Sequence, residues 1–456
     1  TAFGSVTWCQ FFVYQGFNEN TGWMHTSTGT DIIDEFEETI IENKEGLKYV
    51  YGEEQRQLHS YPVTLKYVSD EGLKEKSFTA YRSHHGPITH AEGDKWVATS
   101  LMWEPVKALQ QSFLRTKQKN HKEFKQMMEM KTNSSNNTVF ADSEGNIAYY
   151  HGNFIPKRDT SFDYSKPVDG SNPKTDWDGL HNVDENILIV NPENGWIQNC
   201  NSTPFTAAGM DSPKPENYPA YMTSFPENYR GIHAISLLNK AENLTIDKLI
   251  QLAYDPYLPG ADELISGLLE ASKSRTDLSL RQKAALKVLS SWDFKVQEGS
   301  VAMTLAQYYL NAYKESVSSN YGRKDFIRMV DYMSKESSHR ERLDIFEKAL
   351  AKLEADFETW NTPWGEYNRY QRINGDIVQK FSDSLPSLAV GMASGYWGAL
   401  ASFGTRHGEN TKRVYGVGGN SFVAVVEFGE KVKAKSLLAG GQSGDPESPH
   451  FDDQAQ

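Results

Sequence analysis

The chain has 456 residues, and its 47 Lys and Arg against 60 Asp and Glu give a formal charge of -13. This length allows one large domain or two to three ordinary ones with a sizeable buried core. The negative charge disfavours nucleic acid as a partner and favours a protein that handles small molecules. No run of about 18 apolar residues occurs, so we expect no transmembrane helix and no membrane partner.

The first hundred residues predict short strands. Their β-branched and aromatic residues alternate between clusters of turn-forming residues, in the runs "SVTWCQFFVYQGF", "LKYVYG", "YPVTLKYV" and "KSFTAYRS". Residues 105–130 repeat apolar side chains every three or four positions, which predicts a helical segment. "NTVFADSEGNIAYYHG" then predicts a hairpin that turns at "DSEGN".

The second half of the chain changes from strands to helices and back. Residues 185–204 predict two strands joined through "NPENG". Residues 239–360 predict helices, with an apolar stripe typical of core packing at Leu343, Phe346, Leu350, Leu353 and Phe357. Strands return after Pro386 in "NSFVAVVEFG" and "KAKSLLAGG". We therefore expect an α+β fold with a β-rich core at 1–238, a helical block at 239–360 and returning strands at 361–456.

Several common site motifs are missing from the sequence. No HExxH, CxxC, GxSxG or GxxxxGK motif occurs, which excludes the commonest metalloprotease, redox, hydrolase and nucleotide sites. Cys9 and Cys200 are the only cysteines. A disulfide framework is therefore excluded, and two separate thiols or one bridge remain as alternatives.

Carboxylates and histidines offer candidate ligands. Asp31 and Asp34 are three residues apart and could face one hard cation such as calcium, or they could be solvated surface groups. We expect His25 to be a hydrogen-bonded structural residue. His84 and His85 would point to opposite faces of a predicted strand, so we do not expect them to ligate one metal in the simplest geometry.

The segment "GWIQNCNSTP" places two amides around a thiol. A fixed Asn amide offers two N–H donors, which suit the developing oxyanion of an acyl transfer. Asn199 and Asn201 could instead only cap a turn. The residues alone leave both interpretations open.

Several stretches in one order resemble the penicillin acylase family of N-terminal-nucleophile hydrolases, which includes penicillin amidases and acyl-homoserine lactone acylases. Each stretch alone is short and rich in glycine, but together they extend across nearly the whole chain. They are "GFNENTGWMHT", "HHGPI", "FADSEGNIAYYHGNFIPKR", "NPENGWIQNCNSTP", "LTIDKLIQLAYD", "SWD", "GGNSFVAVVEFG" and "GGQSGDPESPHFDDQ".

The resemblance implies a four-layer αββα fold and an amidohydrolase that cleaves amides of hydrophobic acyl groups. The nucleophile would be an N-terminal Ser that precursor cleavage exposes, with its own α-amino group as the base. The oxyanion donors of the family correspond to the Ser27 backbone N–H and the Asn201 side chain. The supporting Arg of the family corresponds to Arg230, although the spacer before it is longer here.

The resemblance also implies ligands and partners. Calcium ligands, where the family has them, correspond to Asp31, the Ile33 carbonyl and Asp34, and the chemistry itself would need no cofactor. Trp103 and Phe113 would supply part of the acyl pocket. We further expect an α-chain from the same precursor as a partner and a periplasmic or secreted location.

The position of the motifs bears on the nucleophile. Family members carry the catalytic Ser several tens of residues before the position of "GFNEN", so we expect a catalytic chain truncated at both ends and inactive alone. Thr1 is an alternative nucleophile, but the register of the motifs argues against it. A different class of function also stays open, a non-catalytic acyl-ligand-binding or surface protein that retains the fold. A Ser, Thr or Cys after a small residue at the upstream position would favour the enzyme.

Overall fold

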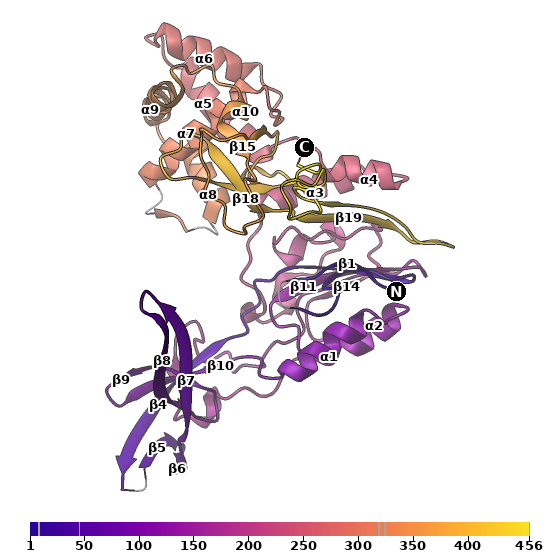
Figure 1. Cartoon of the computed structure of the whole chain (residues 1–456), viewed down its shortest axis with the longest axis vertical. Coiled ribbons are helices and arrows are strands. Elements are labelled where there is room, and N and C mark those ends of the chain that lie inside the picture. The colour runs from indigo at the N-terminus through magenta and orange to yellow at the C-terminus, as the bar shows by residue number, and fades with distance from the viewer. Residues whose placement is uncertain (8–9, 45, 318–319, 323–324, 456) are drawn as a thin grey trace.

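The computed structural model describes residues 1–7, 10–44, 46–317, 320–322 and 325–455. Two β-rich parts and one helical part follow each other along the longest axis of the molecule (Figure 1). Across these described ranges, no helix combines the length and the apolar character needed to cross a membrane.

A six-stranded sheet forms the centre of the first half of the chain. Its order is β1-β2-β3-β11-β12-β14. β3 and β11 are antiparallel and pair from Thr21 opposite Asp142 to Ser27 opposite Asn136. The strands are β1 (Phe3–Ser5), β2 (Gln15–Phe17), β3 (Thr21–Ser27), β11 (Asn136–Asp142), β12 (Ile147–Tyr150) and β14 (Leu188–Val190).

Four layers stack around this sheet, as the resemblance implied (Figure 1). Helices α1 (Pro105–Arg115) and α2 (His121–Met128) cover one face, where Phe124 packs in one cluster with Trp23. The hairpin of β19 (Phe422–Glu427) and β20 (Lys433–Leu438) covers the other face. Helix α4 (Ile246–Ala253) lies against β19 and completes an αββα order.

A second sheet extends away from this core (lower left in Figure 1). Its order is β6-β5-β4-β10-β9, and β13 pairs with β4 in parallel. A long hairpin, β7–β8, stands beside it. The strands are β4 (Asp34–Asn43), β5 (Gly46–Tyr51), β6 (Glu54–Gln57), β7 (His59–Ser69), β8 (Gly72–Arg82), β9 (Ile88–Glu92), β10 (Lys95–Ser100) and β13 (Val168–Asp169).

Helices and a small sheet form the third part. Its helices are α3 (Tyr229–Leu238), α5 (Pro259–Lys273), α6 (Leu280–Ser290), α7 (Val301–Val317), α8 (Phe326–Asp331), α9 (His339–Phe357) and α10 (Trp364–Tyr367). Its sheet contains β15 (Asn368–Tyr370), β16 (Leu388–Ala389), β17 (Phe403–His407) and β18 (Val414–Gly419).

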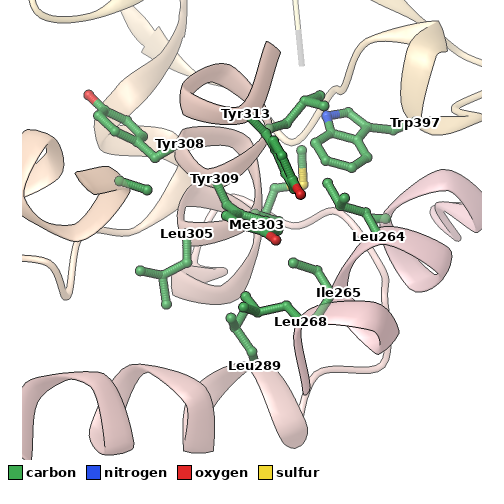
Figure 2. Packing of buried hydrophobic residues seen from close by; sticks show 14 of the residues in the cluster. Leu264, Ile265, Leu268, Leu289, Met303, Leu305, Tyr308, Tyr309, Tyr313 and Trp397 are labelled. Atoms are coloured by element: carbon green, nitrogen blue, oxygen red, sulfur yellow. The ribbon is translucent and has the colours of Figure 1, made fainter. Parts of the chain in front are cut away.

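The largest hydrophobic core lies in this helical part. Side chains of α5, α6 and α7 converge with Trp397, as Figure 2 shows. The stripe predicted on α9 is confirmed as core, because Leu343, Phe346, Leu350 and Leu353 are all buried. Burial of each such side chain contributes roughly 1.5–3 kcal/mol.

Three predicted elements differ from the structure. The first apolar run contains a chain reversal, since β1 ends at its first residue, Ser5, and is the antiparallel partner of β2 at its other end. The helical segment at 105–130 is two helices, because polar residues 116–120 end α1 and the Asn120 side chain caps α2 by accepting from Glu123 N–H. Of the two strands predicted at 185–204, only β14 forms; residues 196–201 follow an irregular path fixed by side-chain amides.

Gly267 lies where the helical core is closely packed, and its substitution tests that packing. A Cβ atom on Gly267 of α5 would lie 2.4 Å from the Ser334 carbonyl oxygen in the π-helix Tyr332–Glu336. We therefore expect Gly267→Ala to lower the free energy of unfolding by about 1–3 kcal/mol, as overpacking does. Chemical denaturation measures this change. Gly299→Ala is the control, because no heavy atom lies within 4 Å of a Cβ there; equal destabilisation of both variants would contradict the packing.

Candidate active site

The last residues of β3 carry the first part of the site. Trp23 is buried, and its indole N–H donates to the Tyr14 carbonyl oxygen at 3.0 Å. His25 is also buried, with its Nδ1 3.0 Å from the Thr138 hydroxyl, and burial holds the pKa of His25 well below its ordinary value. His25 is therefore a neutral structural residue, as predicted. Ser27 ends the strand.

Asn199 fixes the turn that faces the end of β3. Its side-chain oxygen accepts the Asn201 backbone N–H at 3.2 Å and also accepts the Thr26 hydroxyl. Its amide nitrogen lies 3.5 Å from the Tyr149 hydroxyl of β12. Asn199 thus connects the turn to two strands of the central sheet and holds the backbone of Asn201.

Asn201 points its amide at the end of β3. Its backbone has φ 55°, a left-handed conformation that Asn tolerates better than most residues. Its Nδ2 donates to the Ser27 carbonyl oxygen at 3.0 Å. This hydrogen bond uses one of the two N–H groups of the amide. The structure therefore brings Ser27 and Asn201 together, although 173 residues separate them in the sequence.

Arg230 holds the other end of the Asn201 amide. Its Nη2 donates to Asn201 Oδ1 at 3.0 Å, so the nitrogen of the amide must face Ser27. Arg230 lies in the first turn of α3, whose capping residue Asn228 donates to the Cys200 carbonyl oxygen at 3.1 Å. Gly395 leaves room for this guanidinium, because a Cβ there would lie 2.9 Å from Arg230 Cδ.

A cavity of about 520 Å³ opens beside Asn201 and Arg230. This volume is in the range of small-molecule sites. Apolar side chains of three separate segments line it together with polar groups. The lining residues that matter below are Phe225, Phe326, Ile327, Tyr396 and Asn420.

Trp103 and Phe113, the residues expected in the acyl pocket, do not line this cavity. Trp103 is 47% exposed, and the Arg82 guanidinium lies 5.5 Å from its ring. Phe113 is 43% exposed and packs against Phe12 at 5.3 Å between ring centroids. Neither residue is among those lining the cavity beside Asn201 and Arg230. Trp103 instead lines a separate hollow at the start of α1.

The residues expected to bind calcium have a protein cation as partner. Asp34 is 1% exposed, and Arg158 donates to both of its carboxylate oxygens, from Nε at 2.7 Å and from Nη2 at 3.1 Å. The Trp177 indole N–H donates to the same carboxylate at 2.5 Å. Asp34 therefore has its charge neutralised and its oxygens engaged.

Asp31 and Ile33 complete this group. Arg158 Nη2 donates to the Asp31 backbone oxygen at 3.0 Å and lies 3.6 Å from its carboxylate. Burial raises the pKa of Asp31, while Arg158 opposes that rise. Ile33 is 51% exposed. As arranged, Asp31, Ile33 and Asp34 do not fit a calcium ion, because the Arg158 guanidinium already engages both carboxylates.

His84 and His85 differ from the prediction. They follow β8 in the turn before β9, not in a strand, so their rings lie together with centroids 3.8 Å apart. A turn removes the alternation that would have sent the two side chains to opposite faces. Both rings approach Asp176, at 3.7 Å from His84 Nε2 and 2.9 Å from His85 Nε2.

Cys200 is a free thiol in the described part of the chain. Burial raises its pKa to about 11. The thiolate is the nucleophilic form, so Cys200 is a poor nucleophile at neutral pH. Cys9, the other cysteine of the predicted alternatives, lies outside the described residues.

Two participants in these contacts were not predicted from the sequence. Asn137 of β11 donates to the Ser27 carbonyl oxygen at 3.2 Å and is 1% exposed. Arg158 lies in a loop with no periodic pattern, and only its position in "IPKRD" within a matched stretch could have marked it. Neither residue shows a spacing that links it to its partner, because more than a hundred residues separate Asn137 from Ser27 and Arg158 from Asp34.

Comparisons with known proteins identify the family and the fold. The model of the family described as "Penicillin amidase" matches residues 1–456. Penicillin G acylase from Escherichia coli is 30% identical over 193 residues, which are 41% of this chain and 22% of that protein, so the match spans about a fifth of that relative. A thermostable penicillin G acylase from Alcaligenes faecalis has the same fold, with a TM-score of 0.68 and 18% identity over 100% of this chain and 86% of that one. The chain belongs to the penicillin amidase family.

Proposed function

We propose that this chain provides the oxyanion hole of an amidohydrolase that cleaves amides of hydrophobic acyl groups. One observation carries the proposal: Arg230 fixes the Asn201 amide so that its nitrogen faces the end of β3 at Ser27. A donor held in place before the reaction stabilises a developing negative charge without further reorganisation. Family membership supports the same chemistry.

The proposed reaction is acyl transfer to an N-terminal Ser that lies outside residues 1–456. Its hydroxyl oxygen attacks the amide carbon, and its α-amino group takes the proton and delivers it to the leaving amine. The carbonyl oxygen becomes an oxyanion, which the second N–H of Asn201 and the Ser27 backbone N–H stabilise. Water then attacks the carbonyl carbon of the acyl-enzyme, the α-amino group takes its proton and returns it to the Ser oxygen as the ester bond breaks, and the carboxylic acid leaves.

The cavity beside Asn201 supports an apolar acyl substrate. Phe225, Phe326, Ile327 and Tyr396 offer apolar surface to it, and burial of such surface stabilises a complex by roughly 25 cal/mol per Å². Acyl-homoserine lactones, lipopeptides and penicillins share this chemistry of an amide next to an apolar group. Hydrolysis of phenylacetyl, long-chain acyl-homoserine lactone and β-lactam amides by the complete enzyme distinguishes them.

Partners and location follow from the same proposal. We infer an α-chain from the same precursor as the partner and a periplasmic or secreted enzyme. A non-catalytic protein of this fold would also keep the cavity. That alternative predicts that an apolar acyl amide binds to the complete protein and is recovered uncleaved.

The Asn201 side chain is the first target. In the complete enzyme we expect Asn201→Ala to lower kcat by roughly 10² to 10³, about 3 to 4 kcal/mol of transition-state stabilisation. Asn201→Gly is the matched variant, because Gly accepts the left-handed backbone at φ 55° without strain and also lacks the amide. Steady-state kinetics and thermal unfolding should show equal activity losses but lower stability for Ala alone. Normal turnover by either variant would rule out the assignment.

Arg230 is expected to act through Asn201. Arg230→Gln should lower kcat about 10- to 100-fold, because the amide loses the charged donor that sets its orientation. KM should change much less than kcat if Arg230 positions Asn201 and does not bind substrate. Lys240→Gln is the control for the loss of one positive charge just beyond α3. A rise in KM alone would show that Arg230 binds substrate.

We further propose that Arg158 takes the place of calcium in this chain. Arg158→Met removes the charge and keeps much of the volume, so Asp34 would be buried without a cation. We expect the free energy of unfolding to fall by about 3–5 kcal/mol. The exposed pair of Arg56 and Glu54 provides a control, Arg56→Met, with an expected cost below about 1 kcal/mol.

Calcium itself tests the same proposal. The Tm of the wild-type chain should not change with millimolar calcium or with a chelator. The Tm of Arg158→Met should rise with calcium, because its two carboxylates are then free to bind the ion. A calcium-dependent Tm in the wild-type chain that Asp34→Asn abolishes would contradict the proposal.

A further inference from the structure

A second group of titratable side chains lies in the sheet that contains β4. Glu38 comes from β4, and His84 and His85 come from the turn between β8 and β9. One donor atom of each residue lies within 4.8 Å of the other two. Asp176 lies beside both rings. None of these residues lines the cavity beside Asn201.

Glu38 is a buried carboxylate with too few partners. Its side chain is 0% exposed, and its Oε1 lies 2.8 Å from His85 Nδ1. Within the described part of the chain, its Oε2 is buried and has no hydrogen-bond partner. A buried carboxylate oxygen without a donor is costly. A cation bound beside this carboxylate would supply the missing partner.

His85 is held in the orientation that a metal ligand needs. Its Nε2 lies 2.9 Å from Asp176 Oδ1, and the Phe36 ring stacks on its face at 3.9 Å. Asp176 also accepts the Tyr51 hydroxyl at 2.5 Å. A metal-bound His usually donates its other ring N–H to a carboxylate, which fixes the tautomer. Here that arrangement would direct the Nδ1 lone pair of His85 toward Glu38.

His84 supplies the third donor and the opening to solvent. Its side chain is 29% exposed, whereas that of His85 is 4% exposed. The Tyr49 hydroxyl lies 3.0 Å from His84 Nδ1 and steadies the ring. An ion could therefore enter past His84 and reach the buried pair of Glu38 and His85.

We propose that Glu38, His84 and His85 bind one divalent transition-metal ion of the zinc class. Two imidazoles and one carboxylate are a set that zinc takes, at about 2.0–2.2 Å, with a fourth position left for water. Two donors on a tetrahedral ion of that size lie about 3.3 Å apart. The separations here, 2.8 Å between Glu38 and His85 and up to 4.8 Å within the group, need small side-chain rotations to reach it.

Metal titration of the full chain tests the proposal. After treatment with a chelator and dialysis, we expect one equivalent of Zn²⁺ to bind and to raise the Tm. Co²⁺ should bind at the same site and give visible absorption bands typical of a low-coordinate N/O site. Absence of stoichiometric Zn²⁺ binding would overturn the proposal and leave His85 as an ion-pair bridge between Glu38 and Asp176.

Variants assign the ligands. His84→Ala should weaken Zn²⁺ binding at least about tenfold, and Asp176→Asn should weaken it about 10- to 100-fold through the orientation of His85. Both changes are in partly exposed side chains, so far-UV circular dichroism should remain that of the wild type. His90→Ala is the control, because His90 is exposed on the neighbouring β9. Equal Zn²⁺ affinity in His84→Ala and wild type would overturn the proposed set.

Discussion

The candidate site depends on a single junction between the end of β3 and the turn at 199–201. Asn199 ties that turn to Thr26, and Asn201 ties it to the carbonyl oxygen of Ser27. Each bond joins residues more than 170 positions apart, so neither segment can form the site alone. β3 gains its own rigidity from the full pairing with β11. The position of the Asn201 amide beside Ser27 therefore depends on the pairing of β3 within the central sheet.

The two buried carboxylates of β4, Asp34 and Glu38, have different partners. The inward side chains of this strand alternate as Asp34, Phe36 and Glu38, all of them buried. Asp34 receives a guanidinium that satisfies both of its oxygens. Glu38 receives only a histidine, which it shares with a second carboxylate, and one of its oxygens stays unpaired among the described atoms. The buried face of β4 thus carries one completed ion pair and one carboxylate with an unpaired oxygen.

The sequence predicted the local elements better than the contacts. The stripe on α9 and the hairpin of β11 and β12 were correct, because a periodic pattern reports directly on which face is buried. Residues 196–201 were wrongly predicted as a strand, since their path is fixed by side-chain amides of Asn194 and Asn199 and not by a neighbouring strand. The prediction that His84 and His85 point to opposite faces was wrong for a related reason. These residues lie in a turn, where side chains do not alternate as they do in a strand.

The resemblance supplied what periodicity could not. Only the order of short motifs connected Ser27, Asn201 and Arg230, and the structure places these three in one chain of hydrogen bonds. The resemblance did not predict that the Arg158 guanidinium would contact Asp31 and Asp34. A family motif indicates which residues can bind a metal ion, but it does not show which other side chains contact the same carboxylates. Physical partners of a charge are therefore decided by the whole fold and must be read from it.

The helical part of the chain contributes directly to the cavity beside Asn201. Its walls come from the segment before α3, from α8 and from the region around Tyr396, and Gly395 gives Arg230 the space it needs. Phe326 of α8 packs at once against Tyr229 of α3 and against Tyr396, with ring centroids 6.1 and 4.7 Å away. A shift of α8 would therefore move the apolar wall and the helix that carries Arg230 together. The shape of this cavity and the orientation of the Asn201 amide are in this way coupled through one aromatic cluster.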